Sequence, residues 1–535
     1  MKFHINNVDN SECQTEVADR KGQVGMTNRK RFFFNGTLLT IVGLLMKTAA
    51  LLFGAFVSRT VGAEGTGLYT LVMTVYSFAV TFATSGISLT VTRLVASAIG
   101  EDNRGEISKI MKGAILYSLA FSLVATGVLF LGADFFGERV LLDLRSVLSL
   151  RILSLSLVPC ALSSVFTGYF VGVRRVSSNA AVQVLTQFFK VAVTVLLVLR
   201  MSEYGTAMAV GALCIGITLS EAISFLLIFV QFLIDRAKHK NKGDRGVSIS
   251  PVARMALPLA FSAYIRSGLL TLEHILIPKK LSERGKNSSE ALADYGTLHG
   301  MSLPLVLYPM SPLSSFSGLL VPEFAESLSA GDTERMKRIT RESINTTLTY
   351  AIAIAVFLYL FSEELGYIVY DSYSAGKYIA LIAPIVPIMY LDHVTDSMLK
   401  GIGEQVYSMW VNISDSVLSI ILVWILIPKM GIAGYAVVII VMEAYNFTLS
   451  LVRLKSKLIF TIKPFLSIIC PIVCATAAAL LSKNIFSMNG RITTPYWLVM
   501  KIIFAAAVFL ALYVCCHCFF GGKPKFKNLK SEKTA

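Results

Sequence analysis

Fourteen apolar runs, each long enough to cross a bilayer, constrain the fold more than any other feature of this sequence. A membrane-spanning helix needs ~20 mostly apolar residues. Membrane β-strands would be ~10 residues long with alternating polarity, whereas these runs are longer and apolar on all sides. The sequence therefore predicts an all-α polytopic membrane protein with fourteen transmembrane helices. The runs occupy 33–57, 68–92, 112–133, 147–172, 180–199, 207–233, 253–277, 296–321, 344–362, 378–399, 407–427, 433–454, 464–482 and 496–519.

The charge distribution predicts the orientation of these helices. Only 15% of the 535 residues are charged, against about 25% in soluble proteins, which excludes a soluble multidomain chain. Lys and Arg gather on the cytoplasmic side of membrane proteins. With the N-terminus inside, the inner segments hold 31 Lys and Arg and the outer segments 13. We therefore expect a bacterial plasma-membrane protein with both termini cytoplasmic.

The chain also repeats itself, with an offset of 229 residues between several matching positions. Gly172, Arg200-Met201, Gly205 and Ala207 match Gly401, Lys429-Met430, Gly434 and Ala436. A unit of six helices keeps the same orientation in both copies, as in parallel-repeat transporters. The sequence thus predicts two pseudo-symmetric six-helix lobes plus two extra C-terminal helices.

This repeat defines the expected domain boundaries. Residues 1–25 lack the apolar core of a signal peptide, and either Met1 or Met26 is the start. The expected parts are a cytoplasmic disordered tail at 1–31, an N-terminal lobe at 32–233, a cytoplasmic inter-lobe loop at 234–252, a C-terminal lobe at 253–455, helices 13 and 14 at 456–519, and a basic cytoplasmic tail at 520–535.

The run Gly62-Ala63-Glu64-Gly65-Thr66-Gly67-Leu68-Tyr69 is the most specific motif, and Leu320-Val321-Pro322-Glu323 follows in the second lobe. Their order and spacing resemble those of the polysaccharide-exporter branch of the multidrug/oligosaccharidyl-lipid/polysaccharide (MOP) flippase superfamily. Within this branch they are most similar to the sporulation and lipid II flippase members. The resemblance implies a flippase for undecaprenyl-pyrophosphate-linked sugars.

Charged residues inside the apolar runs are the candidate functional groups, because a charge at the bilayer centre costs ~3 kcal/mol and usually faces a cavity or partner. Lys47 lies near the middle of the first run, where the resembling flippases carry an arginine. Their further arginines have no match here. Near the first helix a local offset of 226 aligns Lys47 with Glu273, which predicts either a substrate contact at Lys47 or an ion pair between the two residues.

Three arginines are further candidates. Arg59 and Arg93 lie at the ends of the first two helices, where they serve either as interfacial anchors or as part of a cavity rim. Arg266 shares a helix face with Glu273. Seven intramembrane residues form the predicted substrate-binding cavity: Lys47, Arg59, Arg93, Arg266, Glu273, Asp392 and Asp396.

Carboxylates on later helices suggest coupling to an ion. Asp392, Asp396 and Lys400 are spaced i, i+4, i+8, so they form either a proton or sodium site or a ladder that neutralises itself. The resemblance implies a sodium site among helices 7, 11 and 12. Asn412, Asp415 and Glu443 are its candidate ligands here, since hard cations prefer oxygen.

No nucleotide-binding loop or hydrolase motif is present in the sequence, so we expect no enzyme activity and no cofactor beyond Na⁺ or H⁺. Cys515-Cys516-His517-Cys518 fan around one helix and do not converge on a metal ion. The expected function is alternating-access transport of a polyprenyl-pyrophosphate-linked glycan, with membrane lipids and cell-wall synthesis proteins as the other partners. A multidrug or cation antiporter and a non-transporting scaffold for cell-wall synthesis are the alternatives.

Overall fold

The computed structural model describes residues 10–84, 86–101, 104–173, 175–238, 246–285, 287–458, 460, 465–487 and 495–520. Side chains are described from residue 43 onward. Every regular element in these ranges is a helix, as the apolar runs predict. The predicted basic tail after 520 lies outside them.

The longer helices correspond to the predicted runs. They are α1 (Asn10–Thr84), α2 (Ile87–Gly100), α3 (Arg104–Leu131), α5 (Ser146–Ser154), α6 (Leu157–Gly172), α7 (Val176–Met201), α8 (Thr206–Lys238), α9 (Ile249–Glu283), α10 (Ser288–Tyr295), α12 (Ser311–Ser329), α13 (Thr333–Leu360), α14 (Ser362–Tyr370), α15 (Tyr373–Ile382), α16 (Val386–Gly401), α17 (Gln405–Met430), α18 (Ile432–Lys457), α19 (Cys470–Ser487) and α20 (Pro495–Phe520).

Short elements complete the chain at the ends of spans and at bends within them. They are α4 (Ala133–Phe135), η1 (Phe136–Val140), η2 (Ser202–Tyr204), η3 (Gly296–Ser302), α11 (Leu303–Leu307), η4 (Tyr308–Met310), η5 (Ala383–Ile385) and η6 (Phe465–Ile469).

The described residues contain 12 helices long and apolar enough to cross a membrane, or 13 if the bent pair α5 and α6 counts as one span. This number is below the predicted fourteen, although every predicted run overlaps one of these segments. The difference arises because the segment Gly43–Gly100 contains two predicted helices. Gly62 interrupts α1 there with a φ of 76°, a left-handed conformation that glycine adopts without steric cost.

The start of α1 differs from the predicted disordered tail. The helix begins at Asn10, so residues 10–31 are helical, while residues 1–9 lie outside the described ranges. Glu, Gln, Lys and Arg occur repeatedly in this stretch and Pro is absent from it. These residues favour the helix, which also continues directly into the first apolar run.

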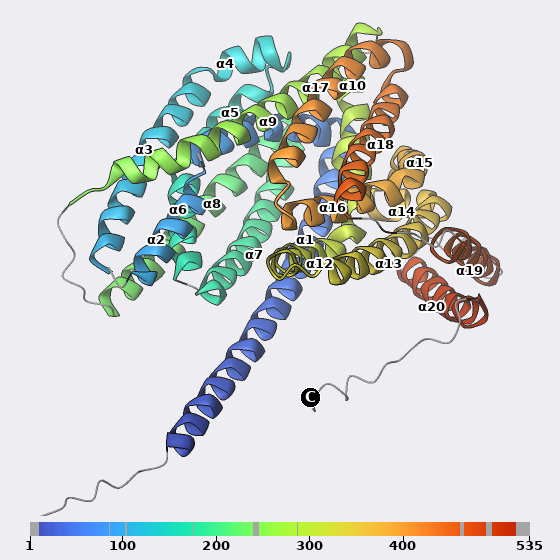
Figure 1. The fold of residues 1–535 in the computed structure, drawn as a ribbon. Helices are drawn as coiled ribbons and strands as arrows, with labels where there is room; N and C mark the ends of the chain where they lie inside the picture. The colour runs from blue at the N-terminus through green and yellow to red at the C-terminus, as the bar shows by residue number, and fades with distance from the viewer. Residues whose placement is uncertain are drawn as a thin grey trace, which may run out of the picture.

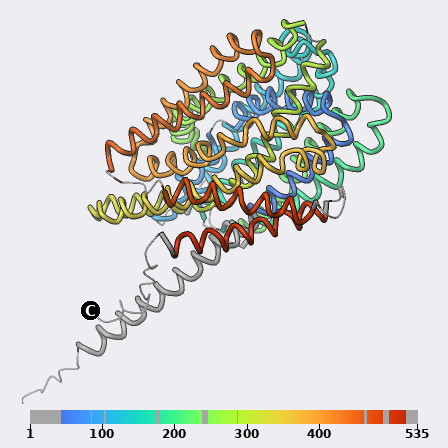
Figure 2. The backbone as a smooth tube through the Cα atoms, turned by 90° about the vertical axis from the view of Figure 1, so that its right-hand side faces the viewer, coloured from blue at the N-terminus to red at the C-terminus, as the bar shows by residue number. Residues whose placement is uncertain are grey.

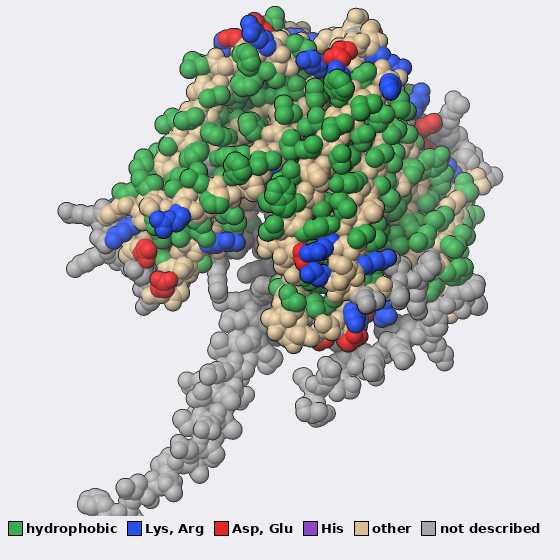
Figure 3. Space-filling view, turned by 45° about the horizontal axis from the view of Figure 1, so that its top comes forward, with side chains coloured by type: hydrophobic (Ala, Val, Ile, Leu, Met, Phe, Trp, Pro, Cys, Tyr) green, Lys and Arg blue, Asp and Glu red, His purple; other side chains and the backbone are tan. Residues whose placement is uncertain are grey.

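The helices gather into two groups with α19 and α20 at one edge. In Figure 1, α2 to α8 lie on the left and α13 to α16 on the right. Helices α19 and α20 pack against each other, and α19 packs on α13, so that the pair flanks the body in both views (Figures 1 and 2). The flank of the body is covered by hydrophobic side chains, and charged side chains gather toward its two ends (Figure 3), as expected for a multi-pass membrane protein.

The repeat read from the sequence recurs in the packing of the helices. A Cβ on Gly172 would lie 3.0 Å from the Val95 Cβ, and a Cβ on Gly401 would lie 2.6 Å from the Phe324 Cβ. The offset that relates Gly172 to Gly401 also relates Val95 to Phe324. The same small residue therefore brings equivalent helices together in both copies, as small residues do in membrane proteins.

Two glycines related by the same offset meet each other directly. A Cβ on Gly67 would lie 1.9 Å from the Leu292 carbonyl oxygen, and a Cβ on Gly296 would lie 2.3 Å from the Ala63 carbonyl oxygen. Ala63 and Leu292 are equivalent by that offset too. Such a reciprocal contact, in which each copy offers the other the same surface, is the arrangement produced by a two-fold axis.

Candidate functional site

Charged residues from four helices converge in one region of the fold, which we call the mixed-charge cluster. Its acids come from α9, α16, α17 and α18, and two cations lie among them. Its members are Glu273, Asp392, Asp396, Asp415, Glu443, Arg266 and Lys400.

Helix α16 supplies a partly neutralised ladder. The Lys400 Nζ lies 2.5 Å from the Asp396 Oδ2, so the predicted self-neutralising pair is present for these two residues. Asp392 lies near the Ser450 side chain on α18, but its Oδ1 is buried and has no hydrogen-bond partner in the described part of the chain.

The three carboxylates of Asp392, Asp415 and Glu443 interact electrostatically, each coming from a different helix. The Asp415 Oδ1 is also buried without a partner among the described residues. Three half-buried carboxylates that repel one another are stabilised by a compensating proton or cation. The nearby Arg266 supplies one positive charge to Asp415.

Asn412 makes a different contact. Its Nδ2 donates to the Ser408 carbonyl oxygen one turn earlier at 2.7 Å. Asp392 of α16 is in electrostatic contact with both Asp415 and Glu443. Spacing within single helices could not reveal that α16 joins α17 and α18 here.

Glu273 is 8% exposed and accepts a hydrogen bond of 2.6 Å from the Ser419 Oγ on α17. The predicted ion pair with Lys47 is not formed in this structure. Next to Glu273, the His274 Nδ1 lies 3.2 Å from the Tyr295 hydroxyl, and the ring centroids of His274 and His299 lie 4.2 Å apart. His299 is thus half-buried and packs against the rings of His274 and Tyr295.

Lys47 is exposed, lies within electrostatic range of His393 on α16, and makes no ion pair with the described residues. Thr48 beside it shares a hydrogen bond of 2.8 Å with the Tyr308 hydroxyl. Tyr308 lies in the middle of the span Ser288–Ser329. This contact places Lys47 near the middle of that segment, against helices of the other sequence repeat.

The other predicted arginines differ in their contacts. Arg59 donates from Nε to the Val369 carbonyl oxygen at 3.0 Å and from a guanidinium nitrogen to the Ile368 carbonyl oxygen. Both carbonyls belong to the last turn of α14, where a cation is favourable. Arg93 and Arg266 are exposed.

Ion pairs at the helix ends lie outside the cluster. Arg145 lies 2.7 Å from both Asp143 and Glu64, so the Glu of the Gly-Ala-Glu-Gly motif links α1 to the start of α5. Glu404, before α17, binds Lys457 and Arg453 at 2.9 Å. These cations, Lys457 first and then Arg453, hold the pKa of the Glu404 carboxyl below its usual range.

Sequence reasoning missed the neutral residues that hold these groups. Ser419 donates a hydrogen bond to Glu273, Tyr308 shares one with Thr48, and Ser450 lies near Asp392. A single Ser or Tyr in an apolar run carries no signal of its own, because most such hydroxyls bond to their own helix.

Two family models match the chain. The model described as "Polysaccharide biosynthesis protein" matches residues 33–328, and the model described as "MatE" matches residues 288–425. The first covers more than half of the sequence. These family matches make the chain a transporter of the MOP superfamily, a class without enzyme activity. Within that class, the chain belongs to the polysaccharide biosynthesis protein family.

The proteins with similar sequences are distant relatives. Stage V sporulation protein B of Bacillus subtilis (strain 168) is 24% identical over 420 residues, covering 77% of this chain and 81% of that protein. Lipid II flippase MurJ of the same organism is 22% identical over 410 residues, covering 68% and 74%. A solved structure of lipid II flippase MurJ in an inward closed conformation covers 91% of this chain and 98% of its own, with a TM-score of 0.64 and 14% identity.

Proposed function

We propose that this protein is a flippase that moves polyprenyl-pyrophosphate-linked sugars, such as the peptidoglycan precursor, across the bacterial cell membrane. Two six-helix lobes alternate access to a central cavity, both termini are cytoplasmic, and α19 and α20 flank the second lobe. Support comes from the family, from the two sequence relatives and from the reciprocal packing of the two repeats.

Lys47 is the observation that carries this proposal. A cation in the middle of a membrane segment is costly unless it meets an anion or water, and Lys47 has no ion-pair partner in the described part of the chain. A pyrophosphate provides the missing negative charge. Lysine meets it as a point charge, without the two-pronged hydrogen bonding of arginine, so contacts from elsewhere in the cavity must orient the cargo.

The mixed-charge cluster provides the coupling site. A proton or Na⁺ bound by Asp392, Asp415 and Glu443 offsets their mutual repulsion. Movement of this ion through the membrane potential and its release into the cytoplasm drive the conformational cycle, since one charge moved through 100 mV supplies ~2.3 kcal/mol. Asn412 and Asp396 are the further candidate ligands, and Arg59, Arg93 and Arg266 are the candidate rim cations.

A multidrug or cation antiporter is the second candidate function. The cluster contains five acids against Arg266 and Lys400, so its net charge is negative, which suits a cationic cargo. The "MatE" match over residues 288–425 includes the acids of α16 and α17, while Glu273 and Glu443 lie outside it. Lys47 opposes this candidate, because it adds a cation at mid-depth.

Native mass spectrometry tests both candidates on the full chain. Purified protein is offered a polyprenyl-pyrophosphate glycan and a cationic drug together, with Lys47→Ala, Lys47→Arg and the exposed Lys429→Ala as variants. The proposal predicts that wild type, Lys47→Arg and Lys429→Ala retain the lipid and that Lys47→Ala loses about tenfold in affinity. Retention of the drug alone would establish the antiporter instead. Retention of neither ligand by wild type would favour the scaffold.

A further inference from the structure

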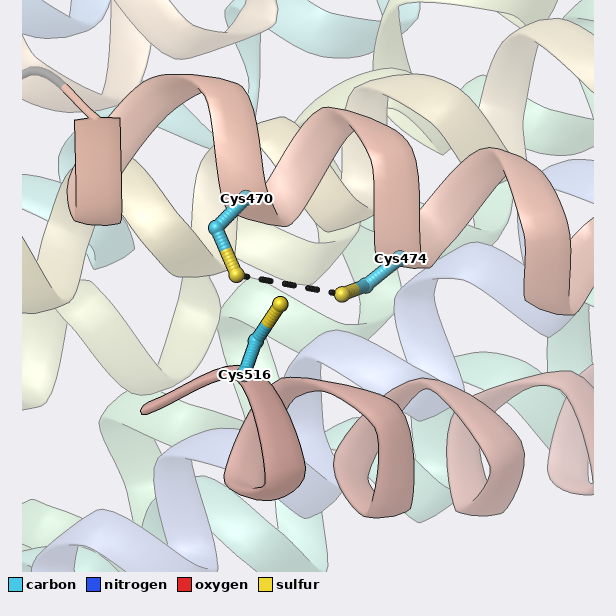
Figure 4. Close-up of side chains that lie close together, drawn as sticks. All are labelled: Cys470, Cys474 and Cys516. Carbon is cyan, nitrogen blue, oxygen red and sulfur yellow. Dashed lines mark hydrogen bonds between the residues drawn. The ribbon is translucent and has the colours of Figure 1, made fainter. Parts of the chain in front are cut away.

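Three cysteine sulfurs meet between α19 and α20, far from the mixed-charge cluster in the fold. Cys470 and Cys474 are one turn apart on α19, and Cys516 lies near the end of α20. The sulfur atoms of Cys470 and Cys474 are 3.8 Å apart, and all three sulfurs lie within 4.8 Å of one another. Figure 4 shows the Cys516 sulfur projecting from α20 between the other two.

These distances fit a single metal ion. Sulfurs that share one zinc ion at ~2.3 Å are ~3.8 Å apart. A triangle with sides of 3.8 to 4.8 Å has its centre about 2.2 to 2.8 Å from each corner, so small side-chain rotations bring all three sulfurs to bonding distance. Since the sulfurs come from two packed helices, they converge from opposite sides, unlike consecutive cysteines on one helix.

The surroundings select the kind of ion. Cys470 and Cys474 are buried and Cys516 is half-buried, with Ala353, Ala475, Ala478 and Phe509 packed around them. No carboxylate or imidazole joins the three sulfurs within the described residues. Thiolates without oxygen ligands select soft ions such as Cu(I) and Zn(II), and hard cations are excluded.

We propose that Cys470, Cys474 and Cys516 bind one soft metal ion, with Cu(I) best suited to three sulfurs and Zn(II) requiring one further ligand. The ion fastens the beginning of α19 to the end of α20. The sequence excluded a metal site formed by Cys515-Cys516-His517-Cys518 alone. In the structure Cys515 and Cys518 are exposed, whereas the Cys516 sulfur joins those of Cys470 and Cys474.

Metal analysis of the full-length protein tests this site. Protein purified under reducing conditions is loaded with Cu(I) or Zn(II) in separate arms, passed over a desalting column with a weak chelator, and analysed by inductively coupled plasma mass spectrometry. We expect about one ion per chain in at least one arm. Cys516→Ser should lower the affinity more than tenfold, while Cys518→Ser, on the same turn of α20, should bind as wild type does.

A second measurement on the wild-type chain guards against a variant that fails to fold. Alkylation followed by peptide mapping should label Cys516 in metal-free protein and not in loaded protein, with Cys518 labelled in both. Failure of wild type to retain either ion would overturn the proposal. So would a disulfide joining Cys516 to Cys470 or Cys474, because it would show that the sulfurs pair covalently instead of binding a metal.

Discussion

Replacing Gly67 or Gly296 by alanine should separate the two sequence repeats where they touch. The new Cβ of Gly296→Ala would lie 2.3 Å from the Ala63 oxygen and 2.4 Å from the Gly67 nitrogen. Comfortable contacts are ~3.5 Å or longer, so the helices must move apart by about 1 Å. Every atom in the way belongs to the backbone and cannot rotate aside. The cost should therefore reach the upper end of the ~1–3 kcal/mol seen for overpacking.

Thermal unfolding of the detergent-solubilised protein, recorded at one heating rate, measures this cost. An expected loss of about 3 kcal/mol lowers Tm by roughly 3–6 °C, since the shift per kcal/mol shrinks as chains grow. Gly318→Ala is the matched control, because Gly318 is helical and nothing lies within 4 Å of its added Cβ. That control should melt at or slightly above the wild-type temperature.

The reciprocal geometry adds a second expectation. Because Gly67 and Gly296 meet at one contact, the double variant Gly67→Ala with Gly296→Ala should lose less than the sum of the two single losses. If both single variants had the same Tm as Gly318→Ala, the two repeats would not be in contact there and the reasoning would fail.

Three further predictions concern the polar contacts. Ser419→Ala should lower the free energy of unfolding by about 1–3 kcal/mol, because Glu273 loses its hydrogen-bond donor; an unchanged denaturation midpoint would contradict this. Arg59→Ala should speed proteolysis or hydrogen exchange of α14, whose last carbonyls lose their donor, while Arg59→Lys should retain part of the protection. Glu404→Gln should lower Tm at pH 7, and the difference should disappear once the pH falls below the lowered folded-state pKa of the Glu404 carboxyl: the carboxylate stabilises the fold fully above the usual glutamate pKa of about 4.3, and this contribution is lost as the pH falls through the folded-state value. A Tm difference that persisted in acid would disprove the ionic origin.

The sequence was sufficient for those features that depend on local pattern. Long apolar runs dictate helices because the bilayer offers no other partner to the backbone, and each predicted run overlaps a described span. The repeat could also be read directly, since matching glycines such as Gly172 and Gly401 fill the same role in both copies. The charges were found because they are rare in apolar runs, not because their partners were known.

The partners were decided only by the tertiary structure. The sequence assigned Asp415 and Glu443 to one candidate site and Asp392 to another, whereas the packing of α16 against α18 and of α17 against α18 unites the three. In the same way, nothing in the sequence indicated the partners of Cys516. They are Cys470 and Cys474, which the packing of α20 on α19 brings close to it. Helical periodicity fixes which residues share a face of one helix. Which faces then meet depends on the packing of small and large side chains over the whole bundle, and no single segment contains that information.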